Sequence, residues 1–214
     1  MSLIKKSFLQ FKKIIPVLAL SYAVIFGLLI SVAIVSFYYN IPVAKFTRDP
    51  TVILLGHPFT GVISNIGILF WCSTSAICLF SSAIHIKNGN AIVSRFLFFS
   101  GLLTLLLLLD DLFTFHEAIF PMYFHIPEEA VYSGYLVLVL TFFLKFKDLI
   151  IKSEYIILLI ACGFFALSIL SDIFLPQIGW EFLLEDGFKL FGIVTWFIFF
   201  VRTCFIQVQG IVNG

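Results

Sequence analysis

Charge is scarce in this sequence. Only 12% of its 214 residues are Asp, Glu, Lys or Arg, whereas an ordinary soluble domain contains about 25%. The net charge is +1, and the sequence has no cluster of basic residues interleaved with aromatics, which nucleic-acid binding would require. These deficits exclude both an ordinary soluble domain and a nucleic-acid-binding protein.

Cysteine motifs and several common catalytic motifs are also absent. The four cysteines lie within apolar runs, without CxxC spacing or a companion histidine, so neither a disulfide framework nor a zinc knuckle is expected. The sequence contains no HExxH, no GxSxG and no glycine-rich phosphate loop. Any chemistry must therefore come from a less familiar arrangement of side chains.

Apolar residues dominate what is present. They make up 61% of the chain, and the mean hydropathy is +1.13. A membrane-spanning helix needs roughly 20 mainly apolar residues, and short polar breaks divide the chain into six such runs. We therefore predict an all-α, polytopic membrane bundle, a single domain over residues 1–214, with six transmembrane helices arranged as three hairpins. The predicted helices cover residues 14–37, 60–84, 91–111, 129–146, 155–174 and 183–205.

Basic residues predict the orientation of this bundle. Ten of the 13 Lys and Arg residues lie at the amino terminus, in the second-to-third and fourth-to-fifth connections, or at the carboxyl end. Cytoplasmic loops carry an excess of Lys and Arg. Both termini are therefore expected in the cytoplasm, with the protein in a bacterial cytoplasmic (inner) membrane or a thylakoid membrane.

Acidic residues show the opposite distribution. Ten of the twelve lie on the predicted extracytoplasmic side, mostly at helix ends. A charged side chain near the bilayer costs about 2.5 to 3.5 kcal/mol on insertion scales, so such groups usually face the bundle interior or water and have partners. We expect one shared vestibule to contain Asp110, Asp111, His116, Glu128, Glu185 and Asp186.

Three interpretations of this cluster stay open: a bound divalent metal ion, a hydrated acidic vestibule, and a proton or ion pathway. Carboxylate oxygens with one or two histidines suit divalent ions from magnesium to zinc. In a metal-dependent enzyme, Glu117 or Glu185 would transfer protons and Lys189 would stabilise developing negative charge. The candidate metal ligands are Asp110, Asp111, His116, Glu128, Glu129 and Asp186.

Lys189 lies about one helical turn inside the predicted sixth helix. Glu185 precedes it by four residues, the favourable order for an ion pair. Asp172, on the preceding helix, is the other candidate partner. Alternatively, Lys189 extends along its long stem to the membrane interface.

Two stripes at helical spacing predict further contacts. If the third helix continues past the hydrocarbon edge, Asp110, Thr114 and Glu117 share one face. The second predicted helix carries a stripe of mostly small residues, which lets membrane helices approach closely. This stripe predicts a contact with another helix, and it is the candidate surface for a second copy of the chain or another membrane protein. Its small residues include Gly61, Ser64, Ser75 and Ser82.

Several motifs resemble those of known families. The DDxFxxHE sequence that starts at Asp110, together with the EDxxKxxG sequence that starts at Glu185, resembles uncharacterised six-helix bacterial membrane proteins. Ser64-Asn65 with the same DDxFxxHE sequence resembles the alkaline ceramidase-like membrane hydrolases, whose metal and catalytic groups lie at helix ends, although their late histidine pair is missing. Glu128-Glu129 with EDxxKxxG resembles the paired acids of type II CAAX-processing intramembrane metalloproteases, without their later histidine motif.

Two functions follow from these patterns. The first is a membrane-embedded, metal-dependent hydrolase or other enzyme at the extracytoplasmic face that acts on a membrane lipid or another apolar substrate. The second is a non-enzymatic protein, either an accessory subunit of a membrane complex or a small ion-coupled carrier. The enzyme needs a lateral opening near the acids, whereas a carrier needs polar groups in mid-membrane, of which the sequence shows few.

Overall fold

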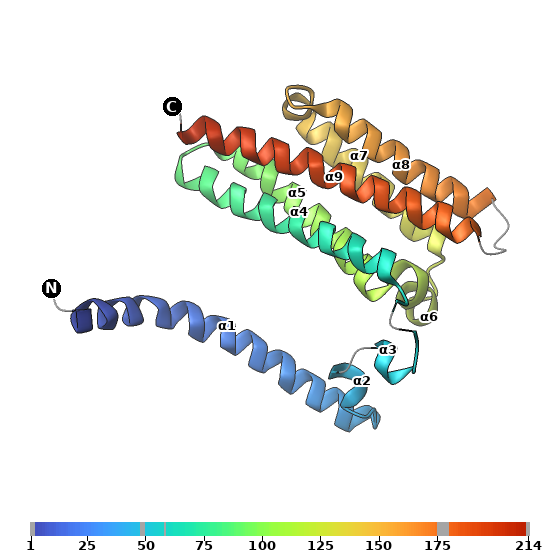
Figure 1. Ribbon diagram of the computed structural model, residues 1–214, viewed down its shortest axis with the longest axis horizontal. Helices are drawn as coiled ribbons and strands as arrows, with labels where there is room; N and C mark the ends of the chain where they lie inside the picture. Colours follow the sequence, from blue (N-terminus) through green and yellow to red (C-terminus); the bar gives the residue numbers. More distant parts are fainter. Residues whose placement is uncertain (1–2, 48–49, 58, 175–179, 213–214) are drawn as a thin grey trace. The chain divides into compact units, whose positions relative to one another are not determined.

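The computed structural model describes residues 3–47, 50–57, 59–174 and 180–212. Within these ranges every regular element is a helix and none is a strand, so the all-α prediction is confirmed. The chain divides into two compact units, Met1–Thr60 and Gly61–Gly214 (Figure 1). This division separates the first predicted helix from the other five.

The first unit consists of one long helix and two short ones. Helix α1 spans Leu3–Tyr39, and its last part, Ile25–Tyr39, is an apolar segment. Asn40 follows it, and its φ of 53° is the left-handed conformation common just after a helix. Helices α2 (Ala44–Thr47) and α3 (Pro50–Ile53) follow.

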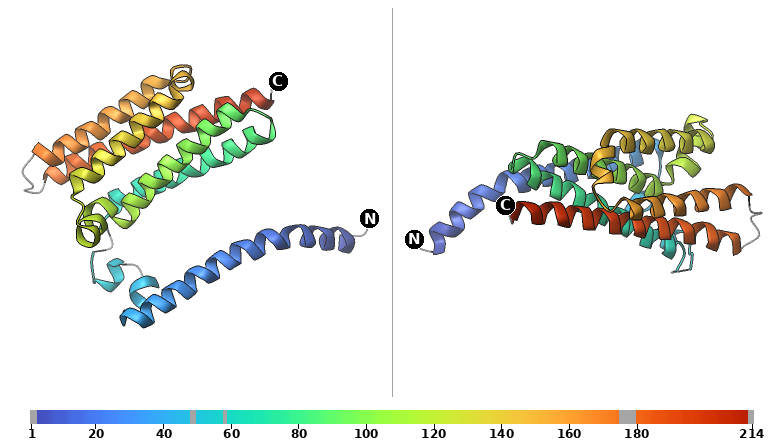
Figure 2. Two further views of the ribbon diagram at one scale, coloured as in Figure 1. Left: turned by 180° about the vertical axis from the view of Figure 1, so that it is seen from behind. Right: turned by 90° about the horizontal axis from the view of Figure 1, so that it is seen from above.

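The second unit is a bundle of long helices, which two further views show lying side by side (Figure 2). The long helices are α4 (Val62–Lys87), α5 (Ala91–Phe113), α7 (Glu128–Ile151), α8 (Tyr155–Phe174) and α9 (Trp180–Val212). Helix α4 packs against α5 and α9, α8 packs against α9, and α5 packs against α7. Between α5 and α7 lie the π-helical turn η1 (Phe115–Ile119) and α6 (Phe120–Phe124).

Four helices among the described residues are long and apolar enough to cross a membrane. The shortest of them has 20 residues, which at 1.5 Å per residue gives about 30 Å, the thickness of the hydrocarbon core. By length and composition, the chain is therefore a multi-pass membrane protein. Helix α7, also predicted to span, is not among these four, and its backbone leaves the helical conformation at Phe146 (φ −112°, ψ 18°). The four spans are Val62–Lys87, Ala91–Phe113, Tyr155–Phe174 and Phe182–Val212.

Small residues bring α4 and α5 into close contact. The Ser75 hydroxyl donates to the Gly101 carbonyl at 2.9 Å, and the Ser82 hydroxyl donates to the Ser94 carbonyl at 2.9 Å. A Cβ atom on Gly101 would lie only 2.7 Å from Cγ of Leu79, so the approach of the two helices requires glycine there. The predicted small-residue stripe on α4 thus forms a helix contact within the chain.

This internal contact limits what the stripe can offer to a partner. Ser75 and Ser82 are buried against α5, whereas Gly61 and Ser64, at the N-terminal end of α4, are exposed. Binding of a second copy or another membrane protein through the stripe stays a prediction. The residues accessible for it are those at its N-terminal end.

Aromatic side chains of α9 fill the centre of the bundle. Trp196, Phe199 and Phe200 are at most 2% exposed. Nε1 of Trp196 donates to the Thr104 hydroxyl at 3.1 Å, and its ring lies edge-on to that of Trp71, with centroids 6.1 Å apart. These contacts hold α9 against α4 and α5.

The acidic helix ends gather at one end of the second unit. The C-terminal ends of α5 and α8 and the N-terminal ends of α7 and α9 lie there, whereas the α4–α5 connection lies at the opposite end (Figure 1). Acidic residues that are far apart in the sequence are therefore brought into one region of the bundle.

Candidate functional site

Helix α5 ends in a turn that folds the chain back onto the end of the helix. Thr114 has left-handed backbone angles (φ 50°, ψ 47°), and its N–H donates to the Asp110 carbonyl. This conformation is strained for a residue with a Cβ atom. The next turn, η1, is π-helical, a rare geometry that is frequent at functional sites. The predicted stripe of Asp110, Thr114 and Glu117 is therefore wrong, because α5 does not continue past Phe113.

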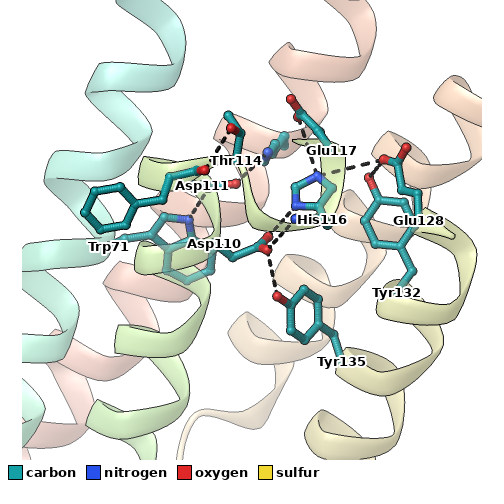
Figure 3. Close-up of polar contacts among 11 residues, drawn as sticks. Trp71, Asp110, Asp111, Thr114, His116, Glu117, Glu128, Tyr132 and Tyr135 are labelled. Atoms are coloured by element: carbon teal, nitrogen blue, oxygen red, sulfur yellow. Dashed lines mark hydrogen bonds and ion pairs between the residues drawn. The ribbon is translucent and has the colours of Figure 1, made fainter. Parts of the chain in front are cut away.

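The turn places His116 against Asp110 (Figure 3). Nδ1 of His116 lies 2.5 Å from Oδ2 of Asp110, and the His116 backbone N–H donates to Oδ1 at 3.1 Å. The Tyr135 hydroxyl, from α7, donates to the same Oδ1 at 2.6 Å. Asp110 and His116 are each 4% exposed. These hydrogen bonds offset the cost of burying the carboxylate and fix the orientation of the imidazole.

The other ring nitrogen of His116 faces two glutamates. Nε2 lies 3.5 Å from Oε1 of Glu117 and 3.9 Å from Oε1 of Glu128, and Glu128 accepts a hydrogen bond from Tyr132 at 2.9 Å. Burial alone would lower the pKa of His116, but the hydrogen bonds with Asp110 and Glu117 outweigh it and raise the pKa to about 9. The contact with His116 lowers the pKa of Glu117. At neutral pH the site therefore holds an imidazolium between carboxylates.

Asp111 forms a second charged pair. Nζ of Lys189, from α9, lies 2.7 Å from Oδ1 of Asp111, and Nε1 of Trp71, from α4, donates to Oδ2 at 2.8 Å. The sequence predicts Glu185 or Asp172 as the partner of Lys189, and the structure corrects this to Asp111. The physical reason is burial. The Asp111 side chain is only 10% exposed, and a buried carboxylate requires a cationic partner more strongly than an exposed carboxylate does.

A cavity of about 360 Å³ adjoins both pairs, a volume within the range of small-molecule sites. Its wall away from the charged groups is formed by apolar residues of α7, α8 and α9. Three of these wall residues are themselves well exposed: Leu136 (59%), Leu140 (49%) and Ile169 (40%). The cavity therefore opens at the surface that α7 and α8 form. The acidic and basic residues that line it are Asp110, Asp111, His116, Glu117, Asp172, Glu185 and Lys189.

The structure brings most of the predicted site residues together. Glu128 does not line the cavity, but its Oε1 lies 3.9 Å from Nε2 of His116, which does. Asp186 lines a smaller neighbouring pocket with Asp111 and Lys189. Glu129 does not line the cavity; it is exposed at the start of α7, where its backbone carbonyl accepts a hydrogen bond from Ser133. The predicted residues that line the cavity itself are Asp110, Asp111, His116, Glu117, Glu185 and Lys189.

Three residues of the cavity are not among the candidate site residues predicted from the sequence: Tyr132, Tyr135 and Trp71. The available signal for Tyr135 is its position seven residues after Glu128, which places both on one face of α7. Trp71 gives no such signal, because its partner Asp111 lies 40 residues away in the sequence. Trp71 is instead expected to pack against a neighbouring helix.

A preformed metal site is not found in the described part of the chain, where no group of three or more His, Cys, Asp or Glu side chains is arranged to hold an ion. Asp110 is hydrogen-bonded to His116 and Tyr135. Asp111 forms an ion pair with Lys189 and accepts a hydrogen bond from Trp71. A metal ion held by the predicted ligands would have to displace some of these partners. Metal binding stays a prediction.

Comparison with known proteins identifies one family. A family model described as "Domain of unknown function (DUF8692)" matches residues 17–203, and the chain therefore belongs to this family. No curated protein and no solved structure matches the chain.

Proposed function

We propose that this chain is a six-span protein whose cavity, at the extracytoplasmic face, binds an amphiphilic molecule and exchanges protons with its polar end. The observation that carries the proposal is the cavity, which joins the Asp110–His116 pair to an apolar wall and opens at the surface of α7 and α8. An amphiphile could enter from the lipid and place its polar group beside His116. The basic residues of the sequence support the orientation, with both termini in the cytoplasm.

The proposed chemistry is general acid–base catalysis. Asp110 holds Nδ1 of His116, so the proton available for transfer is on Nε2. With a pKa raised to about 9 by its carboxylate neighbours, against the effect of burial, His116 is protonated at neutral pH and suited to act as the acid. Glu117, which stays ionised, would accept a proton in return. Glu185 and Lys189 line the same cavity and would contact the polar group of the substrate.

A divalent metal ion at this cluster would change the reaction to metal-assisted hydrolysis, in which the ion activates water. Elemental analysis of the detergent-purified full chain tests this version. A stoichiometric metal that is lost in Asp110→Asn and retained in Glu129→Gln supports the metal-dependent hydrolase. If the active wild-type protein contains less than one equivalent of metal, the metal-dependent version is wrong and acid–base catalysis by the side chains alone is the version that is left.

The carrier alternative receives less support from the buried polar groups. Thr74 and Ser100 donate to backbone carbonyls of their own helices at 2.8 Å, and Thr104 accepts a hydrogen bond from Trp196. These hydroxyls are engaged in helix structure and helix contacts. A non-enzymatic role as an accessory subunit is tested by the turnover experiment described below.

Quenching of tryptophan fluorescence tests whether the cavity binds an amphiphile. Trp71 and Trp196 line it, so an uncharged alkanol brominated on its chain should quench them in a saturable manner. Ala166→Phe, which adds bulk at the cavity wall, should weaken the quenching. Leu159→Phe is the matched control, because Leu159 is 60% exposed on the same helix and does not line the cavity. Quenching that is equal in both variants would contradict the proposal.

Turnover is tested by incubating the reconstituted protein with a total lipid extract and analysing it by mass spectrometry. We expect a lipid species to decrease with the wild type and to persist with His116→Asn. Tyr135→Phe removes one donor to Asp110 without touching the histidine, and should slow the reaction. Glu129→Gln should react normally. If no species changes with folded wild-type protein, the chain is not an enzyme acting on these lipids.

A further inference from the structure

A groove of about 330 Å³ lies between α5 and α7 and is separate from the cavity described above. The two share no lining residue. The reason is the helical repeat of α7, which places Leu138 and Lys145 of the groove on a different face from Leu136 and Phe143 of the cavity. The groove is therefore a second candidate binding site.

The groove is apolar and open to the surface of the bundle. Seven of its nine lining residues are Leu or Phe. Phe142 and Phe146 are buried within it, whereas Leu102 and Leu138 are exposed. Along α5 its lining extends from Phe99 to Leu106, which at 1.5 Å per residue is about 10 Å. A hydrocarbon chain lying in the groove would cover this apolar surface.

One charged group, Lys145, lines the groove. Its Nζ lies 4.3 Å from the centre of the Phe99 ring and 5.5 Å from that of Phe146. Phe99 is eight residues, about 12 Å, from the first residue of α5, and α5 is one of the helices long and apolar enough to cross a membrane. The ammonium therefore lies beside an apolar span.

The contacts of Lys145 do not include an anion. Among the residues that the structure describes, its ammonium forms no ion pair, not even with Asp148 three residues later on α7. The other polar group of the groove, the Thr141 hydroxyl, donates to the Val137 carbonyl of its own helix at 2.7 Å. A charged group beside a membrane span usually has a partner of opposite charge, and here an anionic ligand would supply it.

The chemistry of that ligand follows from the two parts of the groove. Lysine binds phosphate groups through charge-assisted hydrogen bonds, and the Leu and Phe side chains match a hydrocarbon chain. Arg95, which is exposed one turn before Phe99 on the same face of α5, adds a second positive charge. Basic pockets between membrane helices bind anionic lipid headgroups. An anionic phospholipid combines the phosphate and the chain in one molecule.

We propose that the groove between α5 and α7 binds a phospholipid with a negatively charged headgroup. Its phosphate lies beside Lys145, and one acyl chain lies along Leu102 and Leu138. This inference is independent of the proposed function, because the groove and the cavity have no residue in common.

Native mass spectrometry of the full chain, released from an uncharged detergent, tests the inference. Phosphatidylglycerol and phosphatidylcholine with identical acyl chains are added in equal amounts. We expect the wild type to bind the anionic lipid about tenfold more tightly, which corresponds to about 1.4 kcal/mol. Lys145→Gln should lose this preference, and Lys145→Arg should keep it. Lys147→Gln is the matched control, because it removes the same charge from an exposed position of α7 outside the groove.

A second pair of variants tests where the acyl chain lies. Leu102→Trp adds bulk at the edge of the groove and should weaken the binding of phosphatidylglycerol. Leu144→Trp should not, because Leu144 is 73% exposed and does not line the groove. If Leu102→Trp does not fold, Leu138→Trp at the other edge takes its place, and Lys145→Met replaces Lys145→Gln in the same way.

Several outcomes would overturn the inference. Equal binding of the two lipids by the wild type would do so, as would an equal loss of preference in Lys145→Gln and Lys147→Gln, which would indicate general surface charge. Binding of phosphatidylglycerol that Leu102→Trp leaves unchanged would place the lipid elsewhere. A dimer of the wild-type chain that Leu102→Trp dissociates would identify a second copy as the occupant of the groove.

Discussion

The Asp111–Lys189 pair can be tested by a double-mutant cycle. Asp111→Asn removes the charge but keeps an oxygen that can accept the Trp71 hydrogen bond, so its effect reports mainly on the ion pair. Lys189→Met removes the ammonium and keeps most of the apolar stem. Each single variant leaves a partly buried group without its partner, whereas the double variant leaves neither.

The magnitude of the coupling follows from the distance and the burial of the pair. At 2.7 Å, opposite unit charges attract by about 6 kcal/mol if the effective dielectric constant is 20. Desolvation of the two groups offsets much of this attraction. Groups in direct contact typically show coupling energies of about 0.5 to 3 kcal/mol, and we expect the upper half of that range because Asp111 is 10% exposed.

Denaturant-induced unfolding in mixed micelles measures the four free energies that the cycle needs. The chain supplies a matched control, Arg202 and Glu154, whose Nε and Oε2 atoms lie 2.5 Å apart but whose side chains are 54% and 39% exposed. Exposed ion pairs contribute less than buried ones, and bidentate Arg–carboxylate pairs are the stronger kind. Because Nη2 of Arg202 also donates to Oε1 of Glu154, this pair should show a measurable coupling that is smaller than that of Asp111 and Lys189. The reasoning is refuted if the control couples as strongly as Asp111 and Lys189, or if a cycle of Glu185→Gln with Lys189→Met gives the larger coupling.

Three further predictions follow. Despite burial, the neighbouring carboxylates raise the pKa of His116 to about 9, so its contribution to stability is complete below pH 6.5 and is lost as the pH rises through 9. This contribution amounts to at most about 3 kcal/mol. The decline in melting temperature over this pH range should therefore be smaller in His116→Gln than in the wild type. Gly101→Ala should destabilise by about 1 to 3 kcal/mol, since its Cβ would lie 2.7 Å from a Leu79 carbon atom, whereas Gly134→Ala, with no neighbour within 4 Å, should not. Reporter fusions after Lys152 should be cytoplasmic and one near Met122 extracytoplasmic; a cytoplasmic signal at Met122 would contradict the proposed topology.

The long helices could be predicted from the sequence because their signal is local. A run of about 20 apolar residues forms a helix in lipid, where every backbone polar group must be satisfied internally. The range predicted for the fifth helix, 155–174, is that of α8 itself, and the third, 91–111, extends by two residues to Phe113 in α5. The length of an apolar run can be read without knowing which helices become neighbours.

The connection after α5 could not be predicted in the same way. A threonine in the left-handed conformation is uncommon, and the sequence around Thr114 contains no pattern that predicts the turn. The turn is stabilised by the Asp110–His116 contact, by the hydrogen bond from the Tyr135 hydroxyl and by the burial of the pair. Tertiary contacts of this kind stabilise a strained backbone that local propensity alone would reject.

The partner of Lys189 illustrates a second limit, and its correction explains why two adjacent aspartates stand at the end of α5. Consecutive residues on a helix point about 100° apart, so Asp110 and Asp111 reach different neighbours. Asp110 binds His116 and the Tyr135 hydroxyl of α7, whereas Asp111 binds Trp71 of α4 and Lys189 of α9. The double aspartate therefore connects the acid–base pair to the helices that close the other side of the cavity. Loss of Asp110 should change the protonation of His116, whereas loss of Asp111 should remove the ion pair with Lys189 of α9 and leave the histidine pair intact.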